Sequence, residues 1–240
     1  MGNPAYYYAN TQSASHENEN KNQRIKQLLG AEEEIKTVAS TLKNNGWNTD
    51  MILFENATED TIKTLKDSPY IFHIATHGFF EKDKKTTNNL SVQIDKHRPQ
   101  ENPLLKSGLI LKGGGEIVEN NDVEFYNIES GVLTAYEAMN LNLDNTNLVI
   151  LSACETGLGE SRTGEGVYGL QRAFIQAGAE NVIMSLFKVN DQVTKELMDV
   201  FYQNWLKTDN KRQSFIDAKK EIRSKYPEPI YWGAFVMIGK

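Results

Sequence analysis

The chain has a single cysteine, Cys154, among its 240 residues. One cysteine excludes an internal disulfide framework and is typical of a reducing compartment, so we expect a cytoplasmic protein. An excess of basic residues is also missing, because 26 lysines and arginines stand against 32 aspartates and glutamates, a net charge of −6. A dedicated nucleic-acid binder would carry a basic face, and direct binding of nucleic acid is therefore not expected.

Long hydrophobic runs and targeting signals are absent as well. No apolar run reaches the ~18 residues that a membrane span requires. Residues 1–10 lack the basic and apolar regions of a secretory leader, so we expect no membrane association. Polar residues dominate positions 10–24, which predicts a flexible segment over residues 1–24. A second polar stretch, residues 81–103, predicts a long loop within the remaining chain.

What the sequence does contain predicts one α/β domain over residues 25–240. Hydrophobic residues make up 39% of the chain, which is enough for a sizeable core. Nearly continuous apolar runs predict buried strands, and amphipathic segments between them predict helices. The strands are expected at residues 51–54, 70–76, 148–152 and 181–187, and the helices at 31–42, from 58, at 134–137, at 167–177 and in two stretches after 191. Their alternation favours a mainly parallel sheet with helices on both faces.

Two local patterns add detail to this architecture. Thr134 and Glu137 have the spacing of a capping box at the start of a short helix. The three consecutive glycines at residues 113–115 predict the turn of a small β-hairpin inserted in the domain.

Reactive side chains follow two of the buried strands. His77 and Gly78 follow residues 70–76, and Cys154 follows residues 148–152. The carboxyl ends of parallel strands share one edge of a sheet, so neighbouring strands would bring this imidazole and thiol together. A cysteine and a histidine are the minimum for thiol catalysis, and the backbone N–H groups of Gly78 and Cys154 could hold a developing oxyanion. The alternative is that Cys154 is simply a small buried hydrophobe.

Other interpretations of the same residues stay open. His73 and His77 share a strand face, and with Cys154 and a water they could bind zinc, although a core histidine is the simpler interpretation of His73. The glycines of residues 164–169 match a dinucleotide fingerprint, but about a dozen residues separate them from the preceding strand, which argues against a nucleotide site. No cofactor and no metal are expected.

Two carboxylates are candidates for contacts with a substrate. Glu155 follows Cys154 directly, and Asp191 follows the strand expected at residues 181–187. Asp191 could accept a lysine or arginine side chain before the scissile bond. It could equally be the N-cap of the next helix.

Six segments in order resemble one known family. They are FHIATHGFF (72–80), PLLKSGLIL (103–111), LVILSACETGLG (148–159), GEGVYGLQRAF (164–174), MSLFKVND (184–191) and YWGAFV (231–236). Together they look like the CHAT domain, a caspase-like cysteine peptidase module often fused to tetratricopeptide repeats. The resemblance covers roughly residues 25–240.

The resemblance implies a caspase/separase-like three-layer sandwich in which His77 and Cys154 form a catalytic dyad. Its implied activity is a cysteine endopeptidase that cleaves a specific protein partner through a thioester acyl-enzyme. A repeat region or another regulatory partner would control it. The alternative from another class is a signalling or scaffold module that binds partners without cleaving them.

One feature departs from the family pattern. Family members usually carry an apolar strand just before a segment like residues 2–5, but here only Met1 precedes it. We therefore expect the first strand of the sheet to be absent and the chain to be a piece of a longer protein.

Overall fold

The computed structural model describes residues 1–8, 25–80, 103–105, 107–120, 130–155, 165–187 and 189–240. Within these ranges, eight strands form one mixed sheet. They are β1 (Gly2–Pro4), β2 (Leu53–Phe54), β3 (Ile71–Phe80), β4 (Ser107–Ile110), β5 (Val132–Thr134), β6 (Leu148–Glu155), β7 (Asn181–Ser185) and β8 (Phe235–Gly239).

The sheet is parallel through its centre and antiparallel at its margins. The strand order is β2-β1-β3-β6-β7-β8, and β4 pairs with β3 and with β5. The pairs from β2 to β7 along this order are parallel, whereas β8 and β4 run antiparallel to their neighbours. The expected α/β architecture with a mainly parallel sheet is confirmed.

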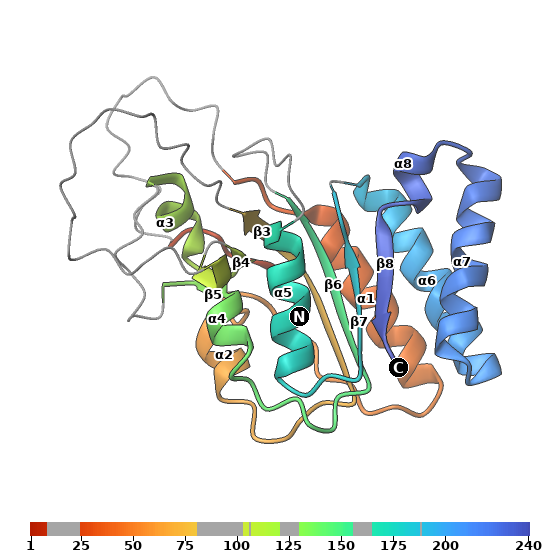
Figure 1. Ribbon diagram of the computed structural model, residues 1–240, viewed down its shortest axis with the longest axis horizontal. Coiled ribbons are helices and arrows are strands. Elements are labelled where there is room, and N and C mark those ends of the chain that lie inside the picture. Colours follow the sequence, from red (N-terminus) through yellow and green to blue (C-terminus); the bar gives the residue numbers. More distant parts are fainter. Residues whose placement is uncertain (9–24, 81–102, 106, 121–129, 156–164, 188) are drawn as a thin grey trace.

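Helices cover both faces of the sheet (Figure 1). They are α1 (Leu29–Asn44), α2 (Glu59–Lys63), α3 (Gly114–Asn120), α4 (Ala135–Ala138), α5 (Glu165–Gln176), α6 (Asp191–Thr208), α7 (Lys211–Lys225) and α8 (Pro229–Trp232), with a 3-10 turn, η3, at Pro103–Leu105. One hydrophobic cluster lies under α2, α4 and α5. A second lies under α1, α6 and α7, so the chain has three layers.

Strand alternation decides which residues enter each cluster. Ile74 of β3 and Val149 of β6 pack into the first cluster, while Leu148 and Ile150 of β6 pack into the second. Successive strand residues point to opposite faces, so a strand covered on both sides must be apolar at nearly every position. Burying each such side chain contributes about 1.5–3 kcal/mol relative to exposure.

The predicted helix signals are present in the structure. Thr134 and Glu137 form both hydrogen bonds of the capping box at the start of α4. The side chain of Thr58 accepts a hydrogen bond from the backbone N–H of Thr61 at the start of α2. Gly178 follows α5 with a φ of +112°, a conformation that glycine adopts without a steric cost.

The hairpin predicted at residues 113–115 is wrong. Gly114 begins α3, and β4 pairs instead with the distant strand β5. The N–H groups of Gly113 and Gly115 donate to the carbonyl oxygens of Ala5 and Tyr6 at 3.0 and 2.9 Å. A Cβ at Gly115 would lie 2.8 Å from the Tyr6 oxygen, so the glycines allow the amino-terminal segment to dock closely.

The sheet has a short first strand where none was expected, and it is formed by Gly2–Pro4 themselves rather than by an apolar stretch before them. Strand β1 lies between β2 and β3, and the backbone N–H of Gly2 donates to the carbonyl of Ile52 at 3.0 Å. Tyr6 is fully buried. Residues 1–8 therefore belong to the folded domain rather than to a flexible segment. The rest of the segment predicted to be flexible, and the loop of residues 81–102, lie outside the described residues.

Among the strands of the described residues, β8 forms one edge of the sheet. Just beyond the ends of the β7–β8 pair, the N–H of Leu186 donates to the Ala234 carbonyl and the N–H of Lys240 donates to the Glu180 carbonyl. With the register of the pair, these bonds indicate that Val236 and Ile238 are the β8 residues that bond to β7. In an antiparallel pair the intervening residues direct their backbone groups outward, and these include Phe235 and Gly239. Lys219 Nζ donates to the Phe235 carbonyl at 2.7 Å, and Arg212 Nη2 donates to the Gly239 carbonyl at 3.1 Å.

Candidate functional site

The pairing of β3 with β6 brings the backbones of the two predicted reactive residues together. The strands pair in parallel from Ile71↔Leu148 onward, and this register makes His77 and Cys154 direct Cα partners. Neighbouring strands lie about 4.8 Å apart. Both residues stand near the carboxyl ends of central strands, where open α/β sheets bind their ligands.

The imidazole of His77 is held by a backbone carbonyl. His77 is half-buried, and its Nε2 donates a hydrogen bond to the carbonyl oxygen of Lys26 at 2.8 Å. A carbonyl oxygen only accepts, so this contact fixes the proton of a neutral imidazole on Nε2. Nδ1 is then the basic nitrogen, as a group that removes a proton from a thiol requires.

An aromatic side chain from the amino-terminal segment lies against His77. The rings of Tyr6 and His77 are 5.1 Å apart between centroids. The Tyr6 hydroxyl bonds to Thr76 Oγ1 at 3.1 Å and accepts a hydrogen bond from the backbone N–H of His77. Burial raises the pKa of Tyr6, so this hydroxyl remains neutral and keeps both contacts. Tyr6 thus supports both the ring and the backbone of His77.

The segment that carries Lys26 is fixed to β1. The side chain of Gln27 donates to the Pro4 carbonyl, and the backbone N–H of Leu28 donates to Asn3 Oδ1, both at 3.0 Å. Asn3 is buried with a φ of +45°, a conformation that asparagine adopts more readily than most residues. Residues 1–8 and 25–28 together hold His77 from one side.

Asp191 and Glu155 have different surroundings. Asp191 is exposed at the first position of α6, and a Cβ on Gly30 would lie 2.5 Å from its own Cβ. Asp191 follows β7, which pairs in parallel with β6, so it lies at the same edge of the sheet as the carboxyl ends of β3 and β6. Asn190, not Asp191, is the N-cap of α6: its Oδ1 accepts from the N–H groups of Gln192 and Val193.

Glu155 and Gly78 are Cα partners at the next position of the same ladder. Gly78 is also paired with Leu109 of β4 on its other side. The side chains of Cys154 and Glu155 lie outside the described part of the structure.

His73 is a core histidine. Its Nε2 bonds to Glu34 Oε1 at 2.7 Å and its Nδ1 bonds to the Tyr202 hydroxyl at 3.2 Å. Both ring nitrogens are engaged, which argues against the zinc alternative. Among the described residues no cluster of potential ligands could hold a metal ion.

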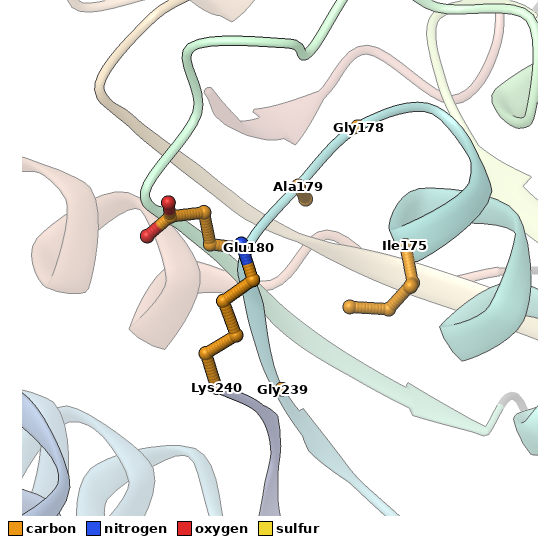
Figure 2. A pocket seen from close by; sticks show the side chains of 6 residues that line it. All are labelled: Ile175, Gly178, Ala179, Glu180, Gly239 and Lys240. Atoms are coloured by element: carbon orange, nitrogen blue, oxygen red, sulfur yellow. The ribbon is translucent and has the colours of Figure 1, made fainter.

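A hollow of about 380 Å³ lies away from these residues (Figure 2). Its lining includes Glu180, where the chain enters β7, and Gly239 at the end of β8. It therefore adjoins the end of the sheet opposite to His77, and we do not assign the chemistry to it.

Two features of the His77 site could not be recognised from the sequence. Tyr6 and Lys26 reach His77 from segments that were predicted to be flexible or to begin the domain. The only signal for Tyr6 is the aromatic run at residues 6–8. Lys26 acts through its backbone carbonyl, which no side-chain pattern reveals. Glu34 does carry a signal, because it lies one turn before Val38 on the apolar stripe of α1.

Across the helices of the described ranges, none is both long and apolar enough to cross a bilayer.

Similarity to known proteins covers nearly the whole chain. Residues 4–240 match the CHAT domain. The chain is also similar to tetratricopeptide repeat protein 28 of Mus musculus, with 32% identity over 110 residues, and to that of Homo sapiens, with 31% over 110 residues. Each alignment covers 45% of this chain but only 4% of the relative, so the chain spans a small part of these proteins. With its sheet, its helical layers and a match from residue 4 to residue 240, the chain belongs to the CHAT domain family, which is related to the caspase-like peptidases.

Proposed function

We propose that this chain is a cysteine endopeptidase in which Cys154 is the nucleophile and His77 the general acid and base. The observation that carries the proposal is the register of β3 and β6, which makes these two residues Cα partners near the carboxyl ends of their strands. The Lys26 carbonyl supports it, because it orients the imidazole and fixes its proton on Nε2.

The proposed reaction has two steps. His77 Nδ1 takes the thiol proton while Cys154 Sγ attacks the carbonyl carbon of a peptide bond, and the N–H groups of Gly78 and Cys154 stabilise the oxyanion. The C–N bond then breaks, and the leaving amine takes the proton from Nδ1, which gives a thioester. Water next attacks the thioester while its proton passes to Nδ1. The C–S bond then breaks, the acid product leaves, and Nδ1 returns the proton to Cys154 Sγ.

Asp191 and Glu155 are the proposed substrate carboxylates. The exposed position of Asp191 after β7, at the same edge of the sheet as the carboxyl ends of β3 and β6, supports a role in binding a lysine or arginine side chain before the scissile bond. Glu155 follows the nucleophile directly, and its role is proposed on that placement alone. The substrate would be a specific protein in the cytoplasm. The repeat-containing relatives support control by a tetratricopeptide region or a comparable partner.

The first experiment measures the reactivity of Cys154. The alkylation rate with iodoacetamide is followed from pH 5 to 10 by intact mass, which is unambiguous because the chain has one cysteine. A dyad gives fast alkylation below pH ~7 in the wild type and an ordinary profile, with a midpoint near ~8.5, in His77→Ala. A wild-type profile that is ordinary and indifferent to His77→Ala contradicts the proposal.

The second experiment tests cleavage. The wild type and Cys154→Ala are incubated with a mixture of peptides that contain every residue before the scissile bond, and the products are identified by mass spectrometry. Cys154→Ala should lose cleavage while its thermal unfolding stays unchanged, and Asp191→Asn should weaken cleavage after lysine and arginine selectively. Full cleavage by Cys154→Ala overturns the assignment. If the wild type cleaves nothing but still binds partners, the scaffold alternative is favoured.

A further inference from the structure

A second polar cluster lies on the same two strands as His77 and Cys154. Its members come from four different elements: Glu34 of α1, His73 of β3, Ser152 of β6 and Tyr202 of α6. All four side chains are buried, and Glu34 is only 3% exposed. The cluster does not belong to the proposed dyad.

The cluster is a connected chain of hydrogen bonds centred on Glu34. Its Oε1 accepts from His73 Nε2 at 2.7 Å and from Ser152 Oγ at 2.5 Å. A neutral His73 that donates from Nε2 accepts at Nδ1, where the Tyr202 hydroxyl lies at 3.2 Å. Burial raises the pKa of Tyr202, so its hydroxyl keeps its proton and can donate. Every donor in the chain has an acceptor.

The position of the cluster relates it to the dyad. His73 precedes His77 by four residues and Ser152 precedes Cys154 by two, so both share the strand alternation of the dyad positions. At a rise of about 3.3 Å per residue, the cluster lies roughly 7–13 Å from the dyad, toward the amino ends of β3 and β6. Glu34 therefore connects the strands of both proposed catalytic residues to α1.

Helix α1 leads back to the dyad by a second route. It begins at Leu29, only three residues after Lys26, whose carbonyl accepts the hydrogen bond from His77 Nε2. Any shift of α1 against β3 and β6 would move that carbonyl relative to the imidazole. Among the described residues no lysine or arginine pairs with Glu34, and a carboxylate buried in this way costs free energy that an apolar residue would not. Stability alone therefore gives little reason for a glutamate here.

We propose that Glu34 is a positioning residue for the dyad: by binding His73 and Ser152 it fixes α1 on β3 and β6, and so holds the Lys26 carbonyl on His77 Nε2. This inference rests on the proposed roles of His77 and Cys154. Glu34 touches neither of them and acts through α1.

The test compares two buried glutamates. Glu34→Gln keeps the side-chain size and one acceptor oxygen, but that oxygen is a neutral amide oxygen, which accepts more weakly from His73 and Ser152 than the carboxylate does. Its NH₂ group also brings two buried donors that need acceptors of their own. Glu59→Gln is the matched control, because Glu59 of α2 is equally buried and lies on the other face of the sheet. The readout is the pH profile of Cys154 alkylation by iodoacetamide, with circular dichroism to confirm folding.

The expected result is a profile for Glu34→Gln that moves toward the ordinary midpoint of ~8.5, with a roughly 10- to 100-fold lower rate near pH 6.5, the loss that misplaced catalytic groups cause. Glu59→Gln should keep the wild-type profile. The direction in which the midpoint moves distinguishes a positioning role from a direct effect of charge. Removing a nearby negative charge would by itself favour the thiolate and lower the midpoint, whereas loss of positioning raises it. The ionisable groups that face this region are His73, Tyr202 and the Met1 amine around Glu34, Tyr6 beside His77, and Asp191 at the same edge of the sheet as His77.

Ser152→Ala provides a second variant if Glu34→Gln fails to fold, since it removes one of the two hydrogen bonds and should give a smaller shift in the same direction. The inference is overturned if the folded variants keep the wild-type profile, or if Glu59→Gln shifts as far as Glu34→Gln. A wild-type profile that depends on His77 while Glu34→Gln leaves it unchanged rejects the positioning role alone. A wild-type profile indifferent to His77→Ala rejects the proposed dyad.

Discussion

Two glutamates are buried in the described part of the chain, one on each face of the sheet, and their partners differ. Glu59, at the start of α2, is paired with Lys63, and its Oε2 accepts from the backbone N–H of Gly131 at 3.0 Å. Lys63 reaches solvent and also pairs with Glu137 of α4 at 2.8 Å. Glu34 has instead a histidine and a serine from the two central strands.

The different partners suggest different roles: Glu59 stabilises its local surroundings, whereas Glu34 holds distant elements in position. Glu59, Lys63 and Glu137, which we call the Glu59 group, join the short helices α2 and α4 and the capping box of α4, so their effect stays on one side of the sheet. The cluster of Glu34, His73, Ser152 and Tyr202, which we call the Glu34 group, joins α1 and α6 to the strands that carry His77 and Cys154. Each face of the sheet has its own apolar cluster, so hydrophobic packing does not distinguish the two faces.

The largest expected effect is the loss of stability when a buried phenylalanine is removed from either face, which tests whether both faces are packed cores. Phe174 of α5 and Phe201 of α6 are both fully buried, one in each cluster. Phe174→Ala and Phe201→Ala should each lower the free energy of unfolding by about 3–5 kcal/mol, because each removes a large apolar side chain and leaves a cavity. Urea unfolding measures both. A cost below ~1 kcal/mol for either one would mean that its face is not a packed core.

A smaller effect is expected from the hydroxyl that bonds to His73. Tyr202→Phe keeps the ring but leaves His73 Nδ1 buried without its partner, at a cost of about 1–3 kcal/mol. Tyr226→Phe is the control, because its hydroxyl bonds to Glu196 in a partly exposed setting and should cost less. Urea unfolding of both variants makes the comparison. Equal losses would indicate that the Glu34 group contributes no more than a surface contact.

The smallest effect is a pair of opposite pH dependences around Lys63. Burial raises the pKa of Glu59. Burial also acts to raise the pKa of Glu137, but hydrogen bonds from Lys63 and Thr134 outweigh it and lower that pKa. Relative to Glu59→Gln, the wild type should therefore lose stability as the pH rises above the unfolded value of ~4.3. Relative to Glu137→Gln, it should lose stability as the pH falls through that value.

Urea midpoints between pH 3.5 and 7 measure both differences. Slopes of the same sign would show that Lys63 does not favour Glu137 over Glu59. The Glu34 group lies apart from these residues and should leave both slopes unchanged, which Glu34→Gln can test in the same series.

Much of the fold follows from local sequence patterns. Strands β3 and β6 are apolar at nearly every position because both faces are covered, and the caps at Thr58 and Thr134 use rules that span only three residues. The pairing of His77 with Cys154 required only the parallel topology. The predicted strand ends were too early, because β3 and β6 continue to Phe80 and Glu155 and include both residues. Their catalytic role stays a prediction.

The features that sequence could not provide depend on contacts between distant segments. The glycines at 113–115 have the local character of a turn, but their role is to receive Ala5 and Tyr6. Asp191 and Asn190 are both good N-caps, and only the path of the chain selects Asn190. Glu34 lies among charged neighbours, so its buried position was hidden by composition although its spacing fits the apolar stripe.

The cations at β8 affect how this protein can assemble. An open strand edge offers its outward carbonyl and N–H groups to any extended chain, and such edges are common starting points for aggregation and for sheets that continue from one molecule to the next. Here Lys219 and Arg212 already occupy two of the outward carbonyls. A strand from another molecule would have to displace both cations before it could pair there. Side chains of α7 therefore protect the sheet against the addition of a further strand at β8.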